Sequence, residues 1–328
     1  MSGRAELPSW AHWKSRPFPD ANLLLLSGRR PALVDTGFVG HAGLTRDWAL
    51  AQAGGRIEVV VNTHWHADHV GGNAAMQEHG AEIMASSHDA EAVQRRHPGC
   101  CLAEYLDQPV APYSVDRGVG DGDILLLGET EWQVIATPGH TPGHLSLWQP
   151  DEQVLVAGDV LSDYDVGWVA SALDGPDAAT VAVASIEKLD ALHPRLLLTA
   201  HGPLPADAPA VLATAHRRAS RLVEDPEGAV WYAARRIFAY ALMIHGGLPV
   251  KEVPGYLLAR AWLADSAKQL NRSAVDVAAE LVEAMRRSGA VTEQDQTLIA
   301  NARHTPVPSH SLKQPWPRMW PPVKKAAR

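Results

Sequence analysis

Three features are scarce or missing in this sequence, and each absence excludes a class of protein. Cysteine is the first, because Cys100 and Cys101 are the only two in 328 residues and they are adjacent. Neighbouring cysteines form a disulfide only with strain, so we expect two reduced thiols in a reducing compartment. A small domain held together by disulfides is excluded, and a chain of this length can bury a core without them.

Long apolar runs and an excess of positive charge are also missing. No apolar run approaches the roughly 18 residues of a membrane span, and the opening MSGRAELPSW has no apolar segment of a signal peptide. The formal net charge of −8 does not favour general binding to nucleic acid or to an anionic membrane. We therefore expect a cytoplasmic protein without membrane contact, for which nucleic acid is a disfavoured partner unless a local basic patch overrides the sum.

Short apolar runs, each followed by a turn or a polar cluster, fill the first part of the chain. They have the form of buried strands, and they cover Asn22–Gly28, Pro31–Gly37, Ile57–His64, Glu131–His140, Gln153–Asp159 and Arg195–Gly202. Helical segments lie between several of them, at Leu44–Ala53, Asn73–Glu78 and Ala178–Leu192. Alternating strands and helices predict an α/β domain over residues 1–205.

The composition changes near Ala206, where alanine, leucine and arginine begin to dominate. Helical spacing of apolar residues predicts helices at Val211–Glu224, Ala229–His245 and Ser273–Gly289, and AVT at 290–292 predicts a short strand. We expect a small helical or winged-helix-like module over residues 206–303. The proline-rich basic tail, residues 304–328, contains Trp316 and Trp320, and we expect it to be extended and held to the surface by these tryptophans.

The stretch THWHADH, Thr63–His69, concentrates candidate metal ligands at the end of a predicted strand. In extended chain alternate side chains point the same way, so His64, His66 and Asp68 share a side. His69 breaks this spacing by one residue, and the VGGN that follows predicts a turn. The motif therefore supplies two neighbouring points in space, with two imidazoles at one and a carboxylate and an imidazole at the other.

Other predicted strands also end in histidine or aspartate. These residues are Asp35, His140, Asp159 and His201, and in α/β folds ligands bind at the carboxyl ends of strands. Imidazole and carboxylate suit zinc, with iron or manganese as alternatives. Five histidines and two aspartates are too many for one tetrahedral ion, so the pattern predicts two metal ions. His144 is either a supporting residue or an ordinary polar residue at the start of a strand.

Together these motifs resemble those of the metallo-β-lactamase superfamily. The matching stretches are THWHADH, TPGHTPGH, AGD and AHG, with LVDTG upstream, and the resemblance covers about residues 20–205. It implies an αββα sandwich with a dinuclear metal centre. The resemblance assigns His64, His66 and His140 to the first metal, Asp68, His69 and His201 to the second, Asp159 to both, and Asp35 to a supporting role.

The pattern also resembles one branch of this superfamily more than the others. A bridging Asp159 together with His69 is similar to the glyoxalase II type, whereas true β-lactamases replace one ligand with cysteine or lack the bridging acid. Residues from about Pro209 to Thr292 resemble the winged-helix-like module of lactamase-like hydrolases and endoribonucleases. Whether such a module binds something, contributes to the pocket or forms a homodimer stays open.

The expected chemistry is hydrolysis. Two divalent ions and two carboxylates leave the site net positive, so a water that bridges the ions would be a hydroxide near neutral pH. We expect a hydrolase with two zinc ions that attacks an ester, thioester or lactone of a small molecule, with Asp68 orienting the hydroxide and passing a proton. Tyr164 and Trp168 follow Asp159 closely and are candidates for substrate contact, although Trp168 fits the core equally well.

Three other functions fit the same ligand pattern. An endoribonuclease would use the C-terminal module to hold RNA. A mononuclear iron persulfide dioxygenase shares much of the ligand set. A binding or regulatory protein would keep the metal site without turnover.

Overall fold

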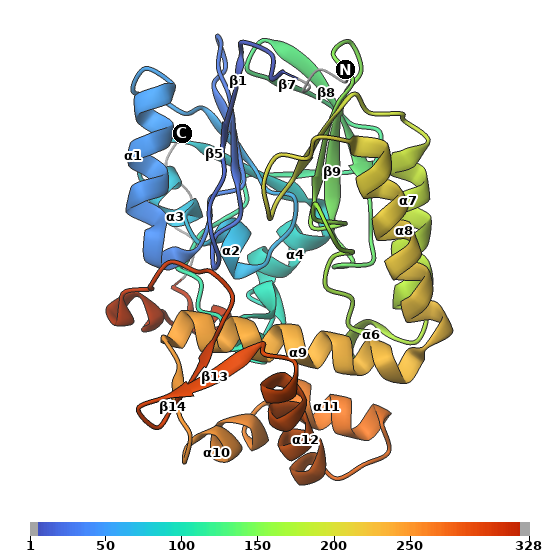
Figure 1. Ribbon diagram of the computed structural model, residues 1–328. Helices are drawn as coiled ribbons and strands as arrows, with labels where there is room; N and C mark the ends of the chain where they lie inside the picture. Colours follow the sequence, from blue (N-terminus) through green and yellow to red (C-terminus); the bar gives the residue numbers. More distant parts are fainter. Residues whose placement is uncertain (1–5, 322–328) are drawn as a thin grey trace.

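Two β-sheets packed face to face form the centre of the protein (Figure 1). The computed structural model describes residues 6–321. In sheet order, the six-stranded sheet contains β1 (Ala11–Lys14), β2 (Leu23–Leu26), β3 (Ala32–Val34), β4 (Val59–Val61), β5 (Glu82–Ser86) and β6 (Arg117–Val119). The five-stranded sheet contains β11 (Leu196–Thr199), β10 (Val154–Gly158), β9 (Leu145–Gln149), β8 (Thr130–Ala136) and β7 (Ile124–Leu127).

Apolar side chains fill both sides of the strands. Alternate residues of a strand point to opposite faces, so Leu24 and Val34 pack between the sheets with Leu147, while Leu23 and Leu33 pack in the cluster that contains the helices. Strands that are covered on both faces are apolar throughout. This explains why strands such as β2, β4 and β10 are uninterrupted apolar runs, whereas β7 and β8 alternate buried and exposed residues.

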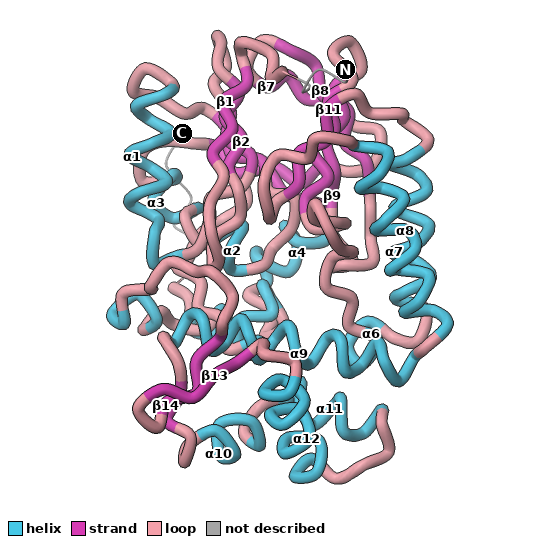
Figure 2. Tube along the Cα trace, in the orientation of Figure 1, coloured by secondary structure: helices cyan, strands magenta, loops and turns pink. Residues whose placement is uncertain are grey.

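Helices cover the outer faces of the sandwich (Figure 2). α1 (Ala42–Gln52), α3 (Asn73–Gln77) and α4 (Ser87–Arg95) lie beside the six-stranded sheet, and α7 (Ala178–Asp190) and α8 (Ala208–Glu224) lie beside the five-stranded sheet. Three shorter helices are α2 (Ala67–Val70), α5 (Ala103–Leu106) and α6 (Ser171–Asp174). The arrangement confirms the predicted αββα sandwich.

The helix α8 packs against α7. Its buried Leu212 and Ala215 share an apolar cluster with Ile186 and Leu189 of α7. The side chain of Asp207 caps the N-terminus of α8 by accepting a hydrogen bond from the backbone of Ala210 at 3.0 Å. The change of composition near Ala206 therefore marks the start of a helix that is attached to the sandwich.

The C-terminal elements lie below the sandwich in Figure 1, with α9 running between the two parts. They are α9 (Pro226–His245), β12 (Leu248–Pro249), α10 (Val253–Leu258), α11 (Ala261–Gln269), α12 (Ala274–Arg287), β13 (Val291–Gln294) and β14 (Thr297–Ala300). The three strands form a sheet in the order β12-β14-β13. The predicted AVT strand is the start of a hairpin. Over residues 6–321, no helix combines the length and apolar composition needed to cross a membrane.

The tail is described as far as residue 321, so Lys324, Lys325 and Arg328 lie outside the described residues. It contains two short 3-10 turns, Ser309–Leu312 and Pro317–Met319. The ring of Trp320 is buried and lies 5.5 Å from that of Tyr113, centroid to centroid. Cys100 and Cys101 are free, buried thiols whose sulfur atoms are 3.4 Å apart.

His41 ties the tail to the N-terminal part of the chain. Its Nδ1 lies 2.6 Å from Oδ2 of Asp20, and its Nε2 lies 3.0 Å from the carbonyl oxygen of Pro306. Both partners are acceptors, so both ring nitrogens donate and the ring is an imidazolium. The hydrogen bond to Asp20 raises the pKa of His41 and outweighs the opposing effect of burial. The guanidinium of Arg16 lies 2.8 Å from the other oxygen of Asp20.

We expect His41→Gln to destabilise the protein in a pH-dependent way. The folded-state pKa of His41 lies above the unfolded value of about 6.5, so its stabilisation is complete below that value and is lost as pH rises through the folded pKa. Urea unfolding should show a loss of about 1–3 kcal/mol at pH 6 and a smaller loss at pH 9. The exposed His79→Gln is the control, and an equal loss at both pH values would contradict the imidazolium assignment.

Candidate metal centre

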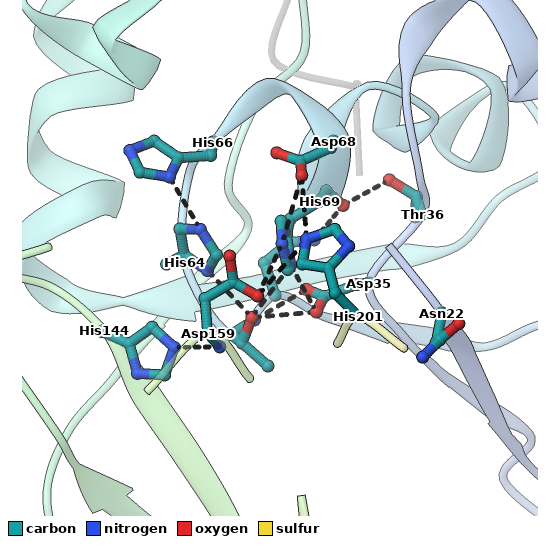
Figure 3. Close-up of polar contacts among 12 residues, drawn as sticks. Asn22, Asp35, Thr36, His64, His66, Asp68, His69, His144, Asp159 and His201 are labelled. Atoms are coloured by element: carbon teal, nitrogen blue, oxygen red, sulfur yellow. Dashed lines mark hydrogen bonds and ion pairs between the residues drawn. The ribbon is translucent and has the colours of Figure 1, made fainter. Parts of the chain in front are cut away.

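Loops at one edge of the sandwich bring the seven predicted ligands together. His64 and His66 follow β4, and α2 carries Asp68 and His69. His140, Asp159 and His201 follow β8, β10 and β11. Figure 3 shows the side chains of Asp68, His69 and His201 converging near Asp159. Residues far apart in the sequence thus meet because their strands end at the same edge.

His64, His66 and His140 form a tight group of imidazoles. The Nε2 of His140 lies 3.0 Å from Nε2 of His64 and 2.9 Å from Nδ1 of His66, and the last two atoms are 3.0 Å apart. Two nitrogen ligands of a tetrahedral zinc ion are roughly 3.3 Å apart, for Zn–N bonds of about 2.0 Å. The triangle of nitrogens therefore has nearly the size of one face of such a site.

Hydrogen bonds on the outer side of two rings fix their orientation. Nδ1 of His140 donates to the carbonyl oxygen of Trp168 at 2.8 Å. The hydroxyl of Thr63 donates to Asp35 at 2.9 Å, so its oxygen accepts from Nδ1 of His64 at 3.1 Å. In the neutral rings the proton is therefore on Nδ1, and both Nε2 atoms direct a lone pair into the group.

Asp68, His69 and His201 form a second group. Nε2 of His201 lies 3.2 Å from Oδ2 of Asp68, and Nε2 of His69 lies 3.8 Å from the same oxygen. The ring of Phe18 stacks on that of His201, with centroids 4.7 Å apart. Nε2 of His69 is buried and makes no hydrogen bond to any residue between 6 and 321.

Asp159 lies between the two groups. Its Oδ1 is 3.5 Å from Nε2 of both His69 and His201, and its Oδ2 is 3.5 Å from Nε2 of His140. Although burial raises the pKa of this carboxyl, His201 and His69 hold it well below the usual range. The side chain is therefore ionised, with one oxygen directed at each group.

The two groups differ in their electrostatics. Burial is the main effect at His64, His66 and His140, and it lowers the pKa of all three, well below the usual value for the first two. Burial also acts on His69 and His201, but nearby carboxylates outweigh it: they raise the pKa of His69 well above its usual value and that of His201 to about 9. The first group holds neutral rings, whereas the second favours bound positive charge.

The donor set fits divalent metal ions. The ligand atoms lie within 4.8 Å of one another in each of three sets: His64, His66 and His140; His64, His69 and Asp159; and Asp68, His69 and His201. Neutral imidazole and ionised carboxylate are ligands that zinc takes. A cation would also bind the buried Nε2 of His69 and the inward lone pairs of the first group. Without a partner, burying these polar atoms costs folding free energy.

Asp35 supports the second group from behind. Its carboxylate accepts hydrogen bonds from the backbone of Thr63 at 2.8 Å, from the hydroxyl of Thr63 at 2.9 Å and from Nδ1 of His69 at 2.8 Å. Its φ of 58° is in the left-handed region, which costs a non-glycine residue roughly 1–2 kcal/mol. The three hydrogen bonds hold this strained position and direct Nε2 of His69 toward Asp159.

His144 supports Asp159 and is fully buried. Its Nε2 accepts a hydrogen bond from the backbone N–H of Asp159 at 3.0 Å, and its Nδ1 lies 2.9 Å from the hydroxyl of Thr137. Burial lowers the pKa of His144 well below the usual value, which keeps the ring neutral and able to accept. Gly158 has a φ of 56°, and a Cβ there would lie 2.6 Å from Nε2 of His144. The glycine of the AGD motif thus lets the strand pass close to this ring.

Both groups border a pocket of about 240 Å³ that opens to solvent. Tyr164 and Trp168, the candidates for substrate contact, both line it. Tyr164 is 54% exposed at the rim. Trp168 is buried, and its Nε1 donates to the carbonyl oxygen of Ala233 at 3.3 Å, so it lines the pocket and belongs to the core at once.

Sequence reasoning missed the pocket residues that come from outside the metal motifs. They are Phe18, Ala302 and, from α9, Arg236, Ile237, Ala239, Tyr240 and Met243. The helical spacing in Ala229–His245 predicts the helix but not which cavity its faces meet. The one available signal is the pair Arg235 and Arg236, two charges within an otherwise apolar stretch of this helix.

Comparisons with known proteins are consistent with this geometry. Residues 17–201 match the family model of the metallo-beta-lactamase superfamily. The probable metallo-hydrolase YflN of Bacillus subtilis (strain 168) is 32% identical over 198 residues, which are 52% of this chain and 74% of that protein. A hydroxyacylglutathione hydrolase of Rhodospirillum rubrum is 36% identical over 114 residues, 34% of this chain and 37% of that protein.

Another relative is the acyl-coenzyme A thioesterase MBLAC2 of Bos taurus, 31% identical over 167 residues, 44% of this chain and 59% of that protein. The matches with the last two relatives thus span less than two thirds of their length. Among solved structures, a metallo-beta-lactamase family protein of Thermus thermophilus superimposes with a TM-score of 0.55 at 23% identity, over 90% of this chain and 100% of that chain. This likeness concerns the fold alone.

We expect Asp35→Asn to weaken metal binding without disturbing the backbone. Asparagine tolerates the left-handed conformation, but it removes the charge that orients His69. Zn²⁺ titration by calorimetry, on protein freed of metal with a chelator, should show affinity at the second group about 10–100-fold lower than in wild type. Asp190→Asn, which changes an exposed aspartate at the end of α7, is the matched control. Wild-type affinity in Asp35→Asn would show that this carboxylate has no supporting role.

Proposed function

The chain belongs to the metallo-beta-lactamase superfamily, and we propose that it is a metal-dependent hydrolase of small-molecule esters, thioesters or lactones. One observation carries the proposal: the two oxygens of Asp159 face two separate histidine groups on the wall of a pocket. Such an arrangement suits a pair of ions that share one carboxylate.

We propose zinc for both ions, on ligand type, with iron or manganese as alternatives. The residues that would hold them are His64, His66 and His140 for the first, Asp68, His69 and His201 for the second, and Asp159 for both. Two divalent ions would supply Lewis acidity and lower the pKa of bound water to about 7.

The chain's own residues position the reaction and move the proton. Asp68 lines the pocket, and its Oδ2 lies 3.2 Å from His201. A carboxylate in this place can take a proton from the attacking water and pass it to the leaving group. Trp168 and His144 fix His140 and Asp159 through hydrogen bonds, so the donor set is organised before a substrate enters.

Two observations support a small-molecule substrate. The printed names of two relatives, a hydroxyacylglutathione hydrolase and an acyl-coenzyme A thioesterase, favour acyl transfer to water. We also propose that α9–β14 form a winged-helix-like module. The acids that α12 exposes at Glu280 and Glu283 are paired with Arg272 and Arg287, so the module offers no surplus of positive charge there, and the formal net charge of −8 disfavours RNA as a partner. Endoribonuclease activity is therefore the less favoured alternative.

We expect Asp159→Ala to lower the metal content toward one ion per chain and to reduce turnover at least about 100-fold, because no other carboxylate faces both histidine groups within residues 6–321. Elemental analysis of purified protein and a substrate assay measure the two effects. Asp190→Ala is the matched control. Wild-type stoichiometry and turnover in Asp159→Ala would remove the basis for a shared carboxylate.

A panel of esters, thioesters, lactones and structured RNA separates the candidate reactions. We expect turnover of an acyl substrate by the wild type, loss of it in His64→Ala, and no cleavage of RNA. RNA cleavage that His64→Ala abolishes would favour the endoribonuclease. One iron per chain with thiol-dependent oxygen uptake would favour the persulfide dioxygenase. Full metal occupancy with no turnover of any substrate would favour a binding or regulatory role.

A further inference from the structure

One stripe in the C-terminal half of α9 lines the pocket. Arg236, Ala239, Tyr240 and Met243 all line the pocket, and they follow the spacing of residues on one side of a helix. Met243 lies seven residues after Arg236, which corresponds to roughly 10 Å along the helix axis. The pocket therefore extends along this part of α9, and its lining also includes the candidate ligands His66, Asp68, His140, Asp159 and His201.

The end of the pocket at Arg236 is polar and open. The guanidinium of Arg236 lies 2.5 Å from Oδ2 of Asp165, next in sequence to the exposed Tyr164. The ring of Tyr232 stacks under the same guanidinium, 4.6 Å from its carbon. This end can hold a polar or charged part of a substrate and leave it in contact with water.

The other end of the pocket is apolar. Met243 and Leu106 line it, and each is only 4% exposed. An ion pair between His245 and Asp107, at 3.1 Å, holds the C-terminal turn of α9 against the segment that carries Leu106. Gln108, two residues after Leu106, also lines the pocket and contributes a neutral amide. A charged group of the substrate would therefore lose its water at this end without gaining an opposite charge.

We propose that the substrate is an ester or thioester of an unbranched aliphatic acid. The acyl chain lies toward Met243 and Leu106, the carbonyl lies at the metal-binding residues, and the leaving group lies toward Arg236 and Tyr164. The inference rests on the proposed hydrolase function. In the reaction water adds across the acyl bond: the C–O or C–S bond breaks, the acyl carbon takes the hydroxyl, and the released alcohol or thiol takes the proton.

The test is the dependence of kcat/KM on acyl chain length, measured with 4-nitrophenyl esters and coenzyme A thioesters from acetyl to dodecanoyl. We expect a rise of about fourfold per added methylene until the apolar end is full, and then a fall. Met243→Phe shortens the preferred chain and lowers the ratio of octanoyl to acetyl kcat/KM about tenfold, whereas Met243→Ala lengthens the preferred chain. Opposite shifts from the two variants cannot come from a general loss of folding.

Met319→Phe is the matched control, because Met319 is 65% exposed and lies in the tail outside the pocket lining. It should keep the wild-type chain-length profile. Arg236→Gln should change the preference between anionic and neutral leaving groups and leave the preferred chain length in place. A flat wild-type profile, or profiles that Met243→Phe and Met243→Ala do not move, would overturn the proposal while leaving a hydrolase in place.

Binding separates a failure of this proposal from a failure of the hydrolase function. Calorimetric titration of the protein as purified with straight-chain carboxylates, from acetate to decanoate, should show affinity that rises with chain length and a negative heat-capacity change. If no ester, thioester or lactone is hydrolysed but this trend and its dependence on Met243 are present, the pocket assignment stands and the hydrolase is refuted. Affinity without a chain-length trend would overturn the pocket assignment.

Discussion

The structure depends on holding five imidazoles and two carboxylates close together out of water. His64, His66, Asp68, His69 and His140 are buried, and Asp159 and His201 are nearly so. Ring nitrogens about 3 Å apart repel through their lone pairs, and a proton placed on any of them is disfavoured by burial. The surrounding fold must stabilise this arrangement, and a bound cation would relieve most of its cost.

That constraint explains the polar layer behind the ligands. Asp35 and Thr63 orient His69 and His64, and His144 holds the backbone of Asp159. The atoms of His64, His69 and Asp159 that face away from the site have hydrogen-bond partners, so their potential metal-binding atoms face inward. The strained backbone at Asp35 and the close approach at Gly158 are costs that the sandwich absorbs to place two side chains. Fold and site are thus linked through a few hydrogen bonds at strand ends.

Much of the fold and of the site's composition could be predicted from the sequence, because both follow local rules. Buried strands are apolar runs, and ligands follow the strands directly, so His140, Asp159 and His201 stand out beside THWHADH. The gathering of these residues at one edge is confirmed by the geometry, whereas their roles as ligands remain predictions. The pocket wall from α9 could not be foreseen, since a helix with apolar residues around most of its surface gives no sign of which cavity it meets. The attachment of α8 to α7 was hidden for the same reason: its composition matches the helices that follow it, while its partner lies earlier in the chain.

The link between His41 and Pro306 has a consequence for how the protein is made. Thr305 also donates a backbone hydrogen bond to Phe18 at 2.6 Å, and Phe18 covers the ring of His201. Contacts with residues 305 and 306 therefore help to hold the beginning of the chain beside the site. During synthesis on the ribosome, these two hydrogen bonds can form only after residues 305 and 306 have left the exit tunnel. One wall of the pocket is thus fastened by a segment that is made after all seven candidate ligands.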